Sequence, residues 1–170
     1  MPWFERRTQS SGKLALGLFV LLVSWLLAGC APAAKGSEPP EIHYGEDLCS
    51  DCGMIINEPR FASGYTYEAE PGRFESFIFD DIGDMLLHMQ KKQALKPVGW
   101  WVHDFDSEEW IDATAAYYVM SDQIKTPMFH GIIAYKDQAA AQQKADEVGA
   151  AVLDWGNVRV EAAMMQHHQH

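Results

Sequence analysis

Cys49 and Cys52 are the residues whose type and spacing most directly indicate chemistry. They form a Cys-x-x-Cys pair, and Met54 follows after a single glycine, Gly53, which permits a sharp backbone turn. This spacing is typical of metal sites and of redox-active dithiols. Thiolate and thioether sulfur favour Cu(I), whereas a structural zinc site usually needs four Cys or His ligands. The motif therefore favours Cu(I) over zinc.

A second set of possible donors lies far along the chain, in Thr126-Pro127-Met128-Phe129-His130-Gly131. Pro127 fixes the backbone before Met128, just ahead of an expected strand. A methionine in such a loop is a candidate copper ligand, and packing in the core stays open as the alternative. His130 could add a nitrogen ligand or could be an ordinary hydrogen-bonding histidine.

A thiol-disulfide protein outside the cytoplasm is the main alternative for the cysteine pair. In an oxidising compartment, two such cysteines can form a disulfide or exchange thiols with a substrate. A redox motif of this kind usually begins a helix that follows a strand. Little strand pattern precedes Cys49. We therefore rank metal binding above redox chemistry and expect a protein that is not an enzyme.

The first 29 residues are typical of a bacterial export signal. Three basic residues precede an apolar run at residues 14–27, which is shorter than the roughly 20 apolar residues of a membrane-spanning helix. Leu27-Ala28-Gly29-Cys30 resembles the lipobox of bacterial lipoproteins. We expect Cys30 to become the lipidated N-terminus, and an uncleaved N-terminal anchor is the alternative. In both cases the protein lies at the membrane, facing the periplasm or the outer cell surface.

Charge and length exclude several classes of function. The whole chain has a net charge of −11, and removal of residues 1–29 leaves ten Lys and Arg against 23 Asp and Glu, a net charge of −13. Nucleic-acid binding needs a positive surface, so we expect no nucleic-acid partner. An acidic surface suits a protein that carries a cation. The mature chain of about 140 residues forms only a modest core.

The remaining pattern predicts an α+β protein. Residues 30–45 have the composition of a flexible stalk. A hairpin is expected from about residue 61 to residue 79, followed by a helix that Asp80 or Asp81 can cap. A similar order of strands and an Ala-rich helix recurs later. We therefore predict a signal peptide at 1–29, a lipidated stalk at 30–45, a first ββαβ half at 46–96, a second ββαβ half at 97–160, and a disordered tail containing His and Met at 161–170.

The cysteine motif also resembles a known family. Residues 49–56 are similar to the Cys-x-x-Cys-Gly-Met-Ile signature of NosL, the accessory lipoproteins of nitrous oxide reductase. Residues 79–85, 102–104 and 111–119 and the segment around Met128 resemble the same family in the same order. The similarity extends from about residue 49 to residue 155.

This resemblance implies a Cu(I) chaperone that delivers copper for the copper-sulfide centre of nitrous oxide reductase. It implies a fold of two ββαβ halves, and it makes Cys52 or Cys49 and Met128 the leading ligands. Its implied partners are nitrous oxide reductase and the ABC-type complex of its maturation. A passive copper store, or a chaperone for another copper protein, stays open.

Overall fold

The computed structural model describes residue 36 and residues 38–167. The predicted signal peptide and the predicted lipidation site at Cys30 lie outside the described residues. Among the described residues, no helix has the length and apolar character that crossing a membrane would require.

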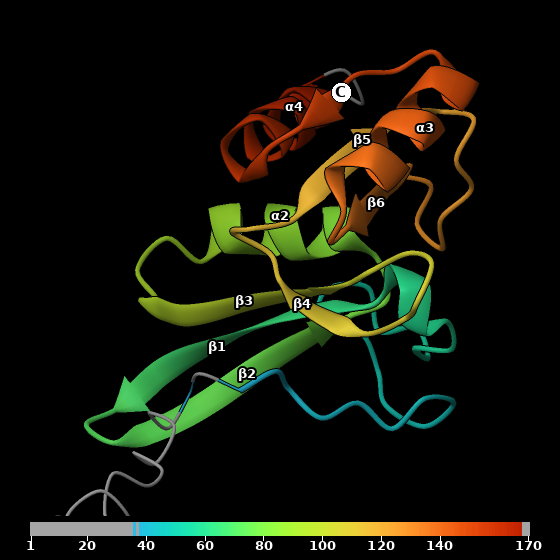
Figure 1. Cartoon of the computed structure of the whole chain (residues 1–170). Coiled ribbons are helices and arrows are strands. Elements are labelled where there is room, and N and C mark those ends of the chain that lie inside the picture. The colour runs from blue at the N-terminus through green and yellow to red at the C-terminus, as the bar shows by residue number, and fades with distance from the viewer. Residues whose placement is uncertain (1–35, 37, 168–170) are drawn as a thin grey trace, which may run out of the picture. The chain divides into compact units, whose positions relative to one another are not determined.

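The first sheet has four antiparallel strands in the order β2-β1-β3-β4 (Figure 1). The predicted hairpin is confirmed, with its turn held by a hydrogen bond of 2.8 Å from the Gly72 amide to the Glu68 carboxylate. A short 3-10 helix, η1, precedes the hairpin. The bounds are η1 Pro59–Phe61, β1 Ser63–Glu70, β2 Arg73–Phe79, β3 Pro97–His103 and β4 Trp110–Asp112.

Helix α2 (Ile82–Lys91) connects β2 to β3 and begins where the predicted cap lies. The Asp81 carboxylate accepts a hydrogen bond from the Gly83 amide, as expected of a residue that caps a helix N-terminus. Ile82, Met85 and Leu86 are buried, because their helical spacing turns one face toward the core. Through this face α2 contacts β1 and β2, and it also contacts α4 (Trp155–His167) and β6 (Ile132–Tyr135) of the second half (Figure 1).

The second sheet has three antiparallel strands in the order β6-β5-β7. A parallel bridge between Asp104 and Ala134 links it to the segment that follows β3. The fold therefore contains β1-β2-α2-β3 and β5-β6-α3-β7, which confirms the predicted α+β class with two ββαβ units. The bounds are β5 Tyr117–Met120, β6 Ile132–Tyr135, α3 Gln138–Val148, β7 Val152–Leu153 and α4 Trp155–His167.

Two segments differ from the sequence-based prediction. β3 begins at Pro97, where we placed the start of the second half, but it pairs with β1 and β4 inside the first sheet. The prediction of a disordered tail from residue 161 is wrong up to His167, because α4 continues to that residue. Val158 and Ala162 are buried in the core one helical turn apart, and this packing stabilises the helix.

Candidate metal centre

The loop that carries the two cysteines is fixed by backbone hydrogen bonds. The Cys49 amide donates to the Met54 carbonyl at 2.8 Å, and the Gly53 amide donates to the Cys49 carbonyl at 3.0 Å. Gly53 has a φ of 75°, so glycine is favoured at this turn. Ser50 joins the loop to the end of β2: its amide donates to the Ile78 carbonyl and its hydroxyl accepts from the Ile78 amide.

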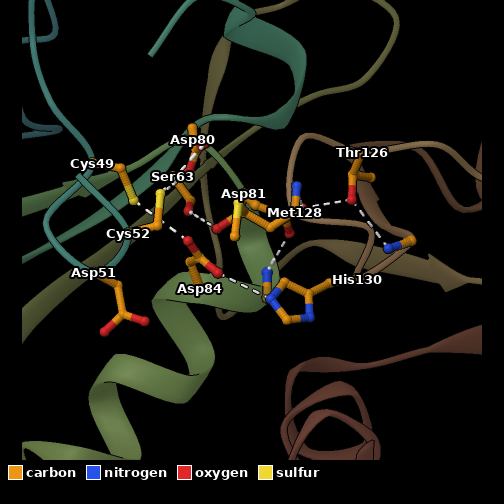
Figure 2. A network of polar contacts seen from close by, with 12 residues as sticks. Cys49, Asp51, Cys52, Ser63, Asp80, Asp81, Asp84, Thr126, Met128 and His130 are labelled. Carbon is orange, nitrogen blue, oxygen red and sulfur yellow. Dashed lines mark hydrogen bonds and ion pairs between the residues drawn. The ribbon is translucent and has the colours of Figure 1, made fainter. Parts of the chain in front are cut away.

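Two carboxylates lie against the two thiols (Figure 2). The Cys49 Sγ lies 3.4 Å from an oxygen of Asp84, and the Cys52 Sγ lies 3.6 Å from an oxygen of Asp80. One ligand atom from each of these four residues lies within 4.8 Å of the others, a spacing that could hold a metal ion. Sequence reasoning missed both carboxylates as part of the site. Their only signal was a cluster of three aspartates at the start of a predicted helix.

Both thiols stay protonated at neutral pH in this environment. Cys49 is only 3% exposed, and burial raises the pKa of its thiol well above the ordinary range. Burial also raises the pKa of Cys52, and the charges of Asp80 and Asp84 add to this shift. Each protonated thiol can therefore donate to its neighbouring carboxylate.

Asp81 attaches the loop of Met128 to the start of α2 by hydrogen bonds. One oxygen of its buried carboxylate accepts from the Gly83 amide, and the other accepts from the Thr126 hydroxyl and, at 3.0 Å, from the Met128 amide. Burial raises the pKa of Asp81 even though these hydrogen bonds oppose the shift. In Figure 2 the Met128 side chain points from its loop toward the cysteines.

His130 completes the network through Asp84. Its Nε2 lies 2.9 Å from Oδ1 of Asp84, whose other carboxylate oxygen is the one facing Cys49. Burial alone would raise the pKa of Asp84, but the hydrogen bonds from His130 and Cys49 outweigh it and the pKa lies below the ordinary value. The hydrogen bond to Asp84 raises the pKa of His130. The imidazole packs so closely on Gly83 that a Cβ atom at that position would collide with it.

The structure thus gathers most of the predicted site residues. Cys49 and His130 share Asp84, and Cys52 lies against Asp80 within the same group of possible ligand atoms. The Met128 amide donates to Asp81, which follows Asp80 directly in the chain. Met54 is 52% exposed, and its backbone carbonyl accepts the hydrogen bond from the Cys49 amide. The role of each of these residues as a metal ligand stays a prediction.

Comparison with known proteins identifies the family. The NosL family model matches residues 41–163. A copper-binding lipoprotein NosL from Stutzerimonas stutzeri is 28% identical over 171 aligned positions, which cover 90% of this chain and 88% of that protein. The crystal structure of the copper chaperone NosL from Shewanella denitrificans matches with a TM-score of 0.59 and 17% identity, covering 69% of this chain and 92% of that one. The second match shows a shared fold. Because the family model spans most of the chain, the protein belongs to the NosL family.

Proposed function

We propose that this protein is a Cu(I) chaperone whose ion is bound by the thiolates of Cys49 and Cys52 and by the thioether of Met128. The observation that carries this proposal is the convergence of two sequence-distant donor segments on the first turn of α2, through Asp81 and Asp84. The names of both relatives, a copper-binding lipoprotein and a copper chaperone, support it.

The negative charge of the site favours binding of a cation. A thiolate formed at Cys49 or Cys52 faces Asp84 or Asp80 at hydrogen-bonding distance, and this repulsion is unfavourable in the absence of a metal. A bound Cu(I) replaces the two thiol protons and offsets one of the two negative charges that the thiolates add. The site therefore holds its protons until the metal arrives.

The difference in exposure between the two cysteines suits transfer of the ion. Cys49 is buried, whereas Cys52 is partly exposed. A low-coordinate ion held by three soft donors leaves room for a ligand from an acceptor, which can approach on the side of Cys52. A closed cage of four ligands would release copper more slowly.

The same observations disfavour thiol-disulfide exchange. The attacking species in that chemistry is a thiolate, and reactive cysteines usually have a lowered pKa at a helix N-terminus or beside a positive charge. Here burial raises the pKa of both thiols, and Cys49 and Cys52 lie in a turn beside carboxylates. Metal binding uses this arrangement better than redox exchange does.

The pH dependence of Cu(I) affinity tests this proposal, and its slope gives the number of thiolates that bind the ion. Because the pKa of each thiol is raised above its ordinary value, each thiolate that binds the ion releases one proton and contributes about a tenfold rise in affinity per pH unit between pH 6 and pH 8. The two thiolates proposed here should therefore give about a hundredfold rise per pH unit, and a rise of about tenfold would indicate a single thiolate. The measurement is competition with bicinchoninate, corrected for protonation of that chelator. Met128→Leu should weaken binding without changing the slope, and a flat or inverted profile would contradict thiolate ligation.

We further propose that lipidated Cys30 anchors the protein outside the cytoplasm and that its client is nitrous oxide reductase, served together with the ABC-type maturation complex. The lipobox and the lipoprotein name of the Stutzerimonas relative support the anchor. The client rests on the sequence resemblance. The copper-loaded chain should deliver copper to apo nitrous oxide reductase, with the maturation complex present, faster than the same Cu(I) held by bicinchoninate. Equal rates would favour a copper store or another client.

A further inference from the structure

Exposed apolar side chains flank both donor segments of the candidate metal centre in sequence. Among the described residues, eight large hydrophobic side chains are exposed, and four of them lie within three residues of a proposed donor in sequence. These four, Leu48, Met54, Ile55 and Phe129, are called here the apolar rim. Leu48 and Ile55 form an isolated antiparallel bridge, so their side chains emerge close together on the cysteine loop.

Phe129 stands out because its conformation is strained and its ring is in solvent. It follows Met128 directly, has a φ of 60° in the left-handed region, and is 77% exposed. A bulky residue rarely adopts this conformation, which glycine adopts without strain. The loop enforces it through a hydrogen bond of 3.0 Å from the Phe129 amide to the Thr126 carbonyl. Packing within the chain does not explain an exposed aromatic ring in a strained loop, whereas a contact with another molecule does.

The surroundings of the apolar rim define the chemistry of that other molecule. Phe129 lines a surface hollow together with Asn57 and Glu58, which places it beside the end of the cysteine segment. Residues 38–58 contain six Asp and Glu and no Lys or Arg. The hollow beside Phe129 is also lined by Arg60, which pairs with Glu108, and by Lys125. The acidic segment that carries the cysteines repels an anionic membrane and attracts a basic protein.

We propose that the apolar rim is the docking surface for the protein that accepts the copper, and that Phe129 is its main anchor. The acceptor should offer an apolar recess bordered by Lys and Arg, next to its own copper ligands. Docking there would bring acceptor ligands to the exposed side of Cys52. This proposal rests on the function proposed above, because it concerns how the bound ion leaves the site.

The experiment compares the wild-type chain with the variants Phe129→Gly and Phe129→Asn. Glycine and asparagine both tolerate a positive φ, so neither substitution should strain the loop. Both variants should keep the Cu(I) affinity within about twofold and release copper to bicinchoninate as the wild type does. Transfer to apo nitrous oxide reductase, with the maturation complex present, should become at least about tenfold slower, as expected when an aromatic interface anchor is removed. Val160→Ala on α4, at another exposed apolar residue, is the matched control and should transfer normally.

The outcomes separate the two proposals. Normal transfer by both Phe129 variants would overturn the docking surface, and so would a loss of Cu(I) affinity in both, which would place Phe129 at the metal itself. Binding of the apolar rim to vesicles of anionic phospholipid would also overturn it in favour of a membrane contact. Failure of the wild-type chain to bind Cu(I) would instead overturn the proposed function.

Transfer by the wild type should slow with rising salt, because the partner is attracted by charge.

Discussion

Replacing Cys52 with serine is expected to lower the affinity for Cu(I) by more than about a hundredfold. Loss of a group that only orients a metal ligand typically costs about 10- to 100-fold in affinity, and loss of a ligand should cost more. A serine hydroxyl can still donate a hydrogen bond to Asp80, but it is a hard donor that does not ionise at neutral pH. Cys49→Ser should have a similar effect, because the proposed site uses both thiolates.

The matched control for these variants is Met54→Leu. Met54 lies two residues beyond Cys52 in the same loop and is exposed, and its backbone carbonyl, which the substitution keeps, accepts the hydrogen bond that closes the loop. Its Cu(I) affinity should stay within about twofold of the wild type, as for an exposed side chain that is not among the three proposed ligands. Competition with bicinchoninate at one fixed pH measures all three variants. Wild-type affinity in both serine variants would refute thiolate binding at this loop.

Local sequence patterns predicted the elements that position the site because each element is specified by neighbouring residues. The turn at residues 70–72 specifies the hairpin, and the cap at Asp81 with apolar residues at helical spacing specifies α2. The tail prediction was wrong because the stability of the last helix comes from burial of Val158 and Ala162. That burial depends on contacts with other elements, and the amphipathic pattern of the segment is weak.

The acidic part of the site was not predictable for a similar reason. Asp80, Asp81 and Asp84 all fit a helix N-terminus, where acidic side chains interact favourably with the helix dipole. Only the fold shows that they face different groups: Asp80 faces Cys52, Asp81 holds the Met128 loop, and Asp84 lies between Cys49 and His130. Sequence spacing singled out the candidate sulfur donors because thiols and loop methionines are rare, whereas aspartates at a helix start are common.

Asp81 is the residue whose loss should most disturb the fold and the site together. Asp81→Ala removes the cap of α2 and leaves the buried Thr126 hydroxyl and the Met128 amide without their acceptor. Each such loss costs about 1–3 kcal/mol. Burial raises the pKa of Asp81, which shows that the ionised carboxylate is itself unfavourable there and offsets part of the loss. We expect the free energy of unfolding to fall by about 2–4 kcal/mol in urea denaturation.

Asp137→Ala provides the matched control, because it removes only a cap. Asp137 accepts a hydrogen bond from the Ala140 amide at the exposed start of α3, far from the cysteines in sequence. It should cost about 1 kcal/mol and leave Cu(I) binding unchanged. Asp81→Ala, in contrast, should also weaken Cu(I) binding by about 10- to 100-fold, although both thiols remain, because the Met128 loop loses its attachment. Equal destabilisation by the two variants, with normal Cu(I) affinity in both, would reduce Asp81 to a helix cap and would separate Met128 from the copper site.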